Sequence, residues 1–446
     1  MRSKLIKKKM SELHLQSTRG STSTKGLLEA VEMGLADDGG LFMPTTFPQV
    51  NWASLPQTNF QECSHSFLSQ WLGTTLSSGQ ISQWIGEALN FQVPIVPIVP
   101  LTNSSAYENT HVLELFHGPT LSFKDFGARS LAFLLSQRIQ QSQQSVTILV
   151  ATSGDTGSAV ADGLSGREGL RVVLLYPKDQ VSPIQEKQLI VRRDGVLAVR
   201  VEGTFDDCQR LVKGSFSDER LKNLRLSTAN SINIGRLIPQ MLYYVWATRQ
   251  LNTEQATFVV PSGNLGNLTA GIFARKSGIP ACQHVAAHNV NDFFPRYLAD
   301  SSTEYSPSLR TISNAMDVGA PSNFERLKFL LSPAEMSALI NGYTVSDAET
   351  LLSMSTVFNE TGYVSDPHTA VGLSVVKREA LNKNAGPVVV LSTAHPAKFP
   401  KTVEKAIGKK IDVPDQLRCL LGMPTDVLDL KPIQQDLSDV ILSHKW

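Results

Sequence analysis

The chain has 446 residues, with 41 lysines and arginines against 40 aspartates and glutamates, so its formal net charge is +1. This balance argues against nucleic acid as a partner, because affinity for a phosphate backbone needs a clustered excess of basic residues. The length allows two or three domains, and 41% hydrophobic residues are typical of a globular protein. The most apolar stretch, residues 91–101, contains three prolines. No run approaches the roughly 18 apolar residues of a membrane span, so no membrane partner is expected.

Residues 1–9 contain five basic residues, but no apolar core of the kind found in secretory signals follows them. We expect this segment to be a disordered, solvated tail. The spacing of the four cysteines matches neither a metal site nor a small disulfide framework, so we expect no metal and a cytoplasmic location. These cysteines are Cys63, Cys208, Cys282 and Cys419.

The order of likely strands and helices predicts the architecture. A helix is expected at 21–34, and amphipathic segments lie between residues 60 and 89. From residue 146 onward, short β-branched runs alternate with glycine-containing turns and helical segments, which predicts βαβ units and parallel sheets. The strand-like runs are 146–151, 171–176, 196–201, 256–260 and 387–391, with a helix at 205–216.

We therefore predict an α/β protein in which two parallel-sheet domains enclose a cleft and an additional domain precedes them. The expected boundaries are 10–100 for the N-terminal domain, 131–234 for the smaller α/β domain, and 101–130 with 235–446 for the large domain.

Two glycine-rich loops, TSGDTG at 152–157 and SGNLGN at 262–267, follow predicted strands and open predicted helices. Backbone N–H groups in such loops can turn toward one point, and a helix N-terminus favours an anion there. Most loops of this kind bind nothing, so each alone is a weak signal. The dinucleotide, Walker A, zinc-peptidase and α/β-hydrolase motifs are all absent.

Lys124 lies in LFHGPTLSFKDFG, residues 115–127, between Phe123 and Asp125. An apolar environment lowers the pKa of a lysine and frees its amine to form a Schiff base. Local composition alone favours the alternative, a solvated lysine at the start of a helix.

Five segments in this order, LFHGPTLSFKDFG, SGDTGSA, NSINIGR, SGNLGN and STAHPAKF, closely resemble the threonine synthase family. These are pyridoxal-phosphate (PLP) enzymes of the tryptophan-synthase-β fold type. STRG at 17–20 and GLADDGGLFMP at 34–44 are similar to the longer fungal and bacterial branch of that family. The resemblance covers residues 13–399 and implies the fold of a fold-type II PLP enzyme.

The resemblance also implies roles for single residues. Lys124 would hold the cofactor covalently and move protons at the substrate. Thr393 would face the pyridine nitrogen of the cofactor, with Ser392 as the alternative. The loop SGNLGN would hold the cofactor phosphate through Gly263, Asn264, Leu265, Gly266 and Asn267.

By the same resemblance, TSGDTG would bind the substrate carboxylate and NSINIGR the substrate phosphate. The role of Asp155 is open, because related enzymes often have asparagine at this place. The implied substrate contacts are Ser153, Asp155 and Thr156 in the first segment, and Asn230, Ser231 and Arg236 in the second.

The activity implied is the conversion of O-phospho-L-homoserine and water to L-threonine and phosphate by γ-elimination and β-addition, the last step of threonine biosynthesis. Two alternatives stay open: a phospho-lyase that gives 2-oxobutyrate from the same substrate, and a non-catalytic relative, which the five intact motifs disfavour. We expect a monomer or homodimer. His117, His368 and His395 are expected to be structural, and His284 with His288 is not expected to bind metal.

Overall fold

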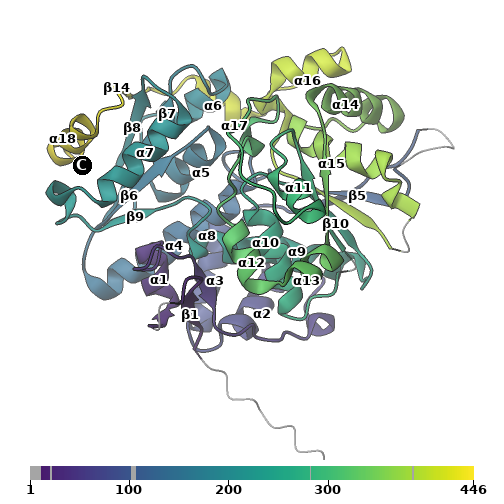
Figure 1. Cartoon of the computed structure of the whole chain (residues 1–446), viewed down its shortest axis with the longest axis horizontal. Helices are drawn as coiled ribbons and strands as arrows, with labels where there is room; N and C mark the ends of the chain where they lie inside the picture. Colours follow the sequence, from purple (N-terminus) through teal and green to yellow (C-terminus); the bar gives the residue numbers. More distant parts are fainter. Residues whose placement is uncertain (1–11, 21–22, 102–106, 282, 384–385) are drawn as a thin grey trace, which may run out of the picture.

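The computed structural model describes residues 12–20, 23–101, 107–281, 283–383 and 386–446. The expected tail, residues 1–9, lies outside them. The described strands form three sheets, and the helices pack around these sheets in three regions (Figure 1). The first region, purple in Figure 1, lies below the junction of the other two.

The N-terminal region combines a small antiparallel sheet, in the order β2-β1-β3, with helices α1, α2 and α3. The predicted helix at 21–34 starts later than expected, because Lys25 and Gly26 pair with β1. The Trp71 indole N–H donates to Ser277 Oγ at 2.8 Å and so joins this region to the large domain. The bounds are β1 (His14–Ser17), β2 (Lys25–Gly26), β3 (Phe42–Pro44), α1 (Leu27–Met33), α2 (Phe60–Leu72) and α3 (Ser78–Ala88).

The smaller α/β domain contains a five-stranded parallel sheet in the order β14-β8-β7-β6-β9. The predicted strands at 146–151 and 196–201 and the predicted helix at 205–216 coincide with β6, β8 and α7. All six residues of β6 are buried, as expected for a central strand covered on both faces. The bounds are β6 (Val146–Ala151), β7 (Leu170–Pro177), β8 (Val196–Val201), β9 (Leu226–Thr228), β14 (Leu428–Leu430), α5 (Asp155–Leu164), α6 (Pro183–Ile190) and α7 (Phe205–Phe216).

The large domain contains a six-stranded sheet in the order β12-β11-β10-β13-β5-β4, parallel except for the antiparallel pair of β4 and β5. Its strands are β4 (Ile95–Pro97), β5 (Thr110–Glu114), β10 (Thr257–Pro261), β11 (Gln283–His288), β12 (Ile340–Thr344) and β13 (Val388–Ser392). Its helices include α4 (Lys124–Ser142), α8 (Ile234–Leu237), α9 (Met241–Leu251), α10 (Gly266–Lys276), α11 (Phe293–Ala299), α12 (Phe324–Leu330), α13 (Pro333–Leu339), α14 (Asp347–Thr361), α15 (Pro367–Arg378), α16 (Pro400–Ile407) and α17 (Asp415–Leu421).

Two segments pair with sheets other than those the predicted boundaries gave them. β4, inside the predicted N-terminal domain, is the edge strand of the large sheet. The C-terminal β14 pairs with β8, and α18 (Gln434–Ser443) packs against α7, so the end of the chain completes the smaller domain. The pairing of β14 with β8 joins segments far apart in sequence, which local pattern does not encode. β4 pairs with the next strand along the chain, so the predicted boundary at residue 100 separates two neighbouring strands of one sheet.

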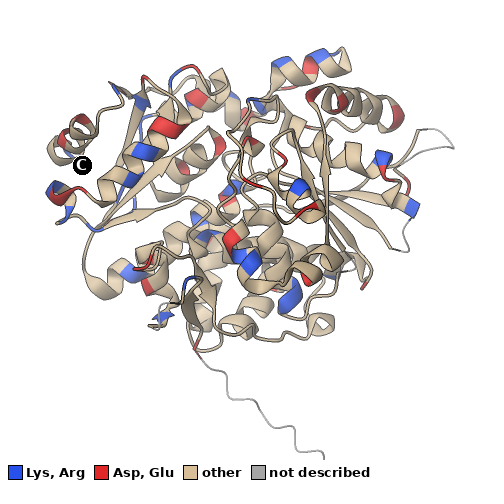
Figure 2. Ribbon diagram, in the orientation of Figure 1, with Lys and Arg blue, Asp and Glu red and all other residues tan. Residues whose placement is uncertain are grey.

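None of the helices that the structure describes is long and apolar enough to cross a membrane. Basic and acidic residues are interspersed along the helices of the ribbon in Figure 2. The connections that follow β6, β10 and β13 lie at the carboxyl ends of their strands, where open α/β sheets bind ligands.

Candidate active site

Lys124 is the first residue of α4, and the loop before it is fixed to the end of β13. The Phe123 N–H donates to the Thr393 carbonyl at 2.9 Å, and Ser122 forms an isolated bridge with Ala394. Burial lowers the pKa of the Lys124 amine to about 8, against an opposing effect of the Asp155 carboxylate. The site therefore holds a lysine that is partly neutral near physiological pH.

Two adjacent hydroxyls follow β13, and the structure separates their roles. The Ser392 hydroxyl lies 2.8 Å from that of Thr369, which in turn contacts Asp366 at the start of α15. Among the described residues, no side chain or backbone group bonds the Thr393 hydroxyl. Of the two hydroxyls, that of Thr393 is the one without a partner among the described residues, and it lies beside the loop that precedes Lys124.

SGNLGN connects β10 to α10 and has the form of a cup. Leu265 adopts a left-handed backbone with φ 59° directly before the helix. The Asn267 amide oxygen accepts from the hydroxyls of Tyr243 and Tyr244 at 2.8 and 2.7 Å, which leaves its buried Nδ2 as a donor without a partner in the described structure. A Cβ on Gly263 would lie 2.8 Å from Met316 Cα, so only glycine fits there.

NSINIGR lies directly against this cup. Asn264 Nδ2 donates to Ser231 Oγ at 2.5 Å, and both Asn230 and Ser231 are half-buried. Arg236 is only 3% exposed and donates to the Ala229 carbonyl. Burial lowers the pKa of Arg236 to about 10, and its charge also acts to lower the pKa of Lys124. The segment therefore contacts the SGNLGN loop through Ser231 and acts on Lys124 through the charge of Arg236.

TSGDTG turns sharply from β6 into α5. Thr152 Oγ1 accepts from the N–H groups of Gly154 and Gly157 at 3.0 and 2.8 Å, which shapes the loop. Ser153 and Thr156 are half-buried. These two side chains and the first N–H groups of α5 can meet an anion at the end of the helix.

The Asp155 carboxylate is occupied by protein groups. Its Oδ1 lies 2.8 Å from Lys398 Nζ and accepts from Gln185 Nε2 at 2.9 Å. Burial opposes ionisation, yet Lys398 and Lys124 together hold the pKa of Asp155 well below its usual range. The side chain is thus an anion, which suits cations better than a substrate carboxylate.

Sequence reasoning missed Lys398, although it lies inside the quoted STAHPAKF. Nothing in the local sequence indicates that this lysine is fully buried. Reasoning also missed the segment around η4 (Asn314–Met316) and α12. Within it, Ser322 N–H donates to Asn264 Oδ1 at 2.5 Å and Asn323 Nδ2 to the Asn264 carbonyl at 3.1 Å. The polar, glycine-containing run before α12 was the available signal.

The histidines take structural positions. His368 Nδ1 lies 2.6 Å from Asp366 Oδ2, and its Nε2 accepts from the Ala315 N–H at 3.2 Å, so both ring nitrogens are used. His284 and His288 lie in β11, where burial lowers their pKa values to about 3 and about 4. The described residues contain no cluster of metal-binding side chains.

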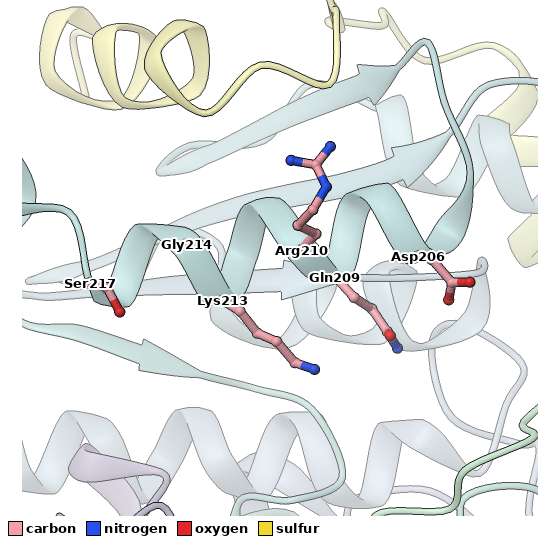
Figure 3. A pocket seen from close by; sticks show the side chains of 6 residues that line it. All are labelled: Asp206, Gln209, Arg210, Lys213, Gly214 and Ser217. Atoms are coloured by element: carbon pink, nitrogen blue, oxygen red, sulfur yellow. The ribbon is translucent and has the colours of Figure 1, made fainter. Parts of the chain in front are cut away.

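A separate hollow lies on α7, and none of the residues that line it is a predicted site residue (Figure 3). Lys213 and Gln209 extend to one side of the helix, whereas Arg210 extends toward α18 and donates to the Pro432 carbonyl at 3.0 Å. The hollow therefore has no part in the arrangement around Lys124.

Comparison of the sequence with known proteins identifies the family of this chain. Residues 91–394 match the family of pyridoxal-phosphate dependent enzymes, residues 14–89 match the threonine synthase N terminus, and residues 369–441 match the threonine synthase C-terminal family. The threonine synthase of Escherichia coli K12 is 39% identical over 94% of this chain and 96% of its own length. The chain belongs to the threonine synthase family.

Other threonine synthases are also similar to this chain in sequence and in structure. That of Saccharomyces cerevisiae is 32% identical over 89% of this chain and 90% of its own length. The PLP-bound threonine synthase structure from Brucella melitensis superimposes with a TM-score of 0.88, at 32% identity, over 96% of this chain and 99% of that one. Maize serine racemase, at 15% identity and a TM-score of 0.53, shares the fold alone.

Membership in the threonine synthase family confirms the predicted fold-type II architecture with its N-terminal domain. It also confirms the predicted enzyme class and cofactor: the chain is a pyridoxal-phosphate dependent lyase of threonine biosynthesis that acts on a small molecule.

Proposed function

We propose that this chain converts O-phospho-L-homoserine and water to L-threonine and phosphate, with the cofactor held at Lys124 between the loops after β6, β10 and β13. The observation that supports this proposal best is the convergence of three groups at the carboxyl ends of the strands: a lysine with a lowered pKa, a glycine loop with a buried amide donor, and a hydroxyl, the last two without a partner among the described residues.

The residues present fit PLP. Asn267 contributes a buried N–H donor that has no partner among the described residues, and the N-terminus of α10 favours a phosphate dianion. Gly263, Asn264, Leu265 and Gly266 complete the cup with backbone groups. The Thr393 hydroxyl would hold the pyridine nitrogen without forcing a proton onto it, since a neutral hydroxyl can either donate or accept.

When bound, PLP supplies an electron sink for negative charge that develops beside the substrate amino group. Lys124 then acts as the base that removes the proton from the substrate Cα and later returns it. The pKa of about 8 suits this task, because a base works best when its pKa lies near the operating pH.

The substrate's two anionic groups require separate sites. Ser153, Thr156 and the backbone N–H of Asp155 would bind the carboxylate at the start of α5, while the Asp155 side chain stays with its cations. Asn230 and Ser231 would bind the phosphate that leaves Cγ, and Arg236 behind them would favour the growing negative charge.

A phospho-lyase that releases 2-oxobutyrate would use the same groups, and the outcome depends on where water adds. The threonine synthase relatives favour threonine as the product. We further infer a cytoplasmic protein, monomeric or homodimeric, without nucleic-acid or membrane partners; the free thiols of Cys63, Cys208 and Cys419 fit a reducing compartment.

Replacement of the lysine tests the proposal. Lys124→Ala should remove both the covalent cofactor absorbance and phosphate release from phosphohomoserine, while the variant melts within a few degrees of the parent protein. Retained turnover in Lys124→Ala would contradict the assignment of this residue.

A further inference from the structure

We propose that Lys398 is a positioning residue: its ammonium group holds the Asp155 carboxylate and takes up that negative charge, so that Lys124 remains free to react as a neutral amine. The inference rests on the proposed attachment of the cofactor at Lys124. It assigns a role to a residue that contacts neither cofactor nor substrate in the proposed arrangement.

The position of Lys398 joins three parts of the site. It ends the short helix η6 (Pro396–Lys398) and is 0% exposed. Its Nζ lies 2.8 Å from Asp155 Oδ1, at the start of α5 in the smaller domain, and donates to the Thr120 carbonyl at 2.9 Å. Thr120 belongs to the loop before Lys124. One ammonium group thus connects the smaller domain, the lysine loop and the segment after β13.

The contacts of Thr120 extend this connection to the first turn of α4. Its N–H and hydroxyl both donate to the Asp125 carboxylate, at 2.9 and 2.7 Å, and Asp125 follows Lys124 directly. Burial raises the pKa of Asp125 to about 6, whereas the two hydrogen bonds from Thr120 act to lower it. The two donors therefore stabilise the ionised form of this carboxyl. Thr120 therefore contacts Lys398 through its carbonyl and Asp125 through its N–H and hydroxyl. Replacing Lys398 would disturb the residue that holds Asp125.

The charges that face Lys124 explain why this matters for reactivity. They are the Asp155 carboxylate, which favours the protonated amine, and the cations of Arg236 and Lys398, which disfavour it. A buried carboxylate without Lys398 would find its cation in Lys124. Lys124 would then stay protonated, and a protonated amine does not attack an aldehyde.

Gln185 does not replace Lys398 in this role. It donates to the same Asp155 oxygen at 2.9 Å, but an amide carries no charge that could compensate a buried anion. Gln185 therefore orients the carboxylate, whereas Lys398 neutralises it.

The test is the pH dependence of PLP uptake by the full chain after its cofactor has been removed, followed by absorbance. In Lys398→Met the midpoint for uptake should rise by about one to two units, as expected when the Asp155 carboxylate acts on Lys124 without the opposing charge of Lys398. Uptake at neutral pH should then be at least about tenfold slower, since one pKa unit changes the neutral fraction tenfold. Lys398→Arg, which retains the charge, should stay close to the parent midpoint.

The double variant Asp155→Asn/Lys398→Met separates this role from simple packing. With both charges removed, the midpoint should return toward that of the parent protein, and Asp155→Asn alone should lower it. If Lys398→Met does not fold, the shift in Asp155→Asn and the return in the double variant still decide.

An unchanged midpoint in Lys398→Met, or a raised midpoint that persists in the double variant, would overturn the inference. Failure of the parent chain to take up PLP at Lys124 would instead overturn the proposed function. The two failures are therefore distinguishable.

Discussion

Replacing Gly263 by alanine should weaken cofactor binding by a mechanism that can be followed from distances. The new Cβ would lie 2.8 Å from Met316 Cα and 3.2 Å from the Ala315 carbonyl oxygen, both backbone atoms that cannot rotate away. Ordinary carbon–carbon contacts begin at about 3.5 Å, so the cup and η4 must separate by about 0.7 Å. Overpacking of this kind costs about 1–3 kcal/mol.

The displaced loop should also lose at least one hydrogen bond to the cofactor phosphate. Hydrogen bonds to charged groups contribute about 1.5–3 kcal/mol, so we expect PLP affinity to fall about ten- to a hundredfold. Absorbance titration of the cofactor-free protein measures this loss, and thermal unfolding of the same protein measures the strain.

The matched control is Gly86→Ala, within α3, where a Cβ would meet no heavy atom within 4 Å. That variant should bind PLP as the parent does and be as stable or slightly more stable, because alanine favours a helix over glycine by about 0.5–1 kcal/mol. A Gly263→Ala protein with the parent's PLP affinity and melting temperature would refute the reasoning about the cup.

Three further predictions concern the neighbouring groups. Thr393→Ala should lower turnover at least about tenfold with little change in melting temperature, whereas Ser392→Ala should keep turnover and lose about 1 kcal/mol of stability with its hydrogen bond; equal effects in the two would contradict the assignment. PLP uptake should increase as pH rises through about 8, because burial lowers the pKa of Lys124 and only its neutral form reacts; a midpoint near its ordinary value would argue against burial. Ser231→Ala removes the acceptor of the Asn264 amide and should weaken PLP binding up to about tenfold in the same titration, and unchanged affinity would show that this contact does not hold the cup.

The sequence predicts correctly those elements whose own residues have a distinctive pattern of hydrophobic, β-branched and turn residues. β6 and β8 coincide with their predicted ranges because each is a short β-branched run, β6 bounded by a turn-rich loop and β8 by a glycine before it. The start of α1 was misplaced, since the pairing of Lys25 with β1 depends on a strand that pattern alone does not reveal. The pairing of β14 with β8 could not be predicted for the same reason, because the two strands are far apart in sequence and meet only in the folded structure.

The site likewise contains residues that the sequence indicates and one that it does not. The positions of Lys124, Asn267 and Thr393 follow from motifs that also fix their surroundings, and the structure brings them to one edge of the sheet. The motif that contains Lys398 gave no sign of its partner, because the ion pair with Asp155 forms only after two domains come together. Burial and charge compensation are tertiary properties, and a sequence displays them only through the residues that they constrain.

The most direct test of the whole account is the product balance of the PLP-loaded protein acting on O-phospho-L-homoserine. The arrangement around Lys124 predicts L-threonine and phosphate in equal amounts. Phosphate released together with 2-oxobutyrate, and without threonine, would contradict it.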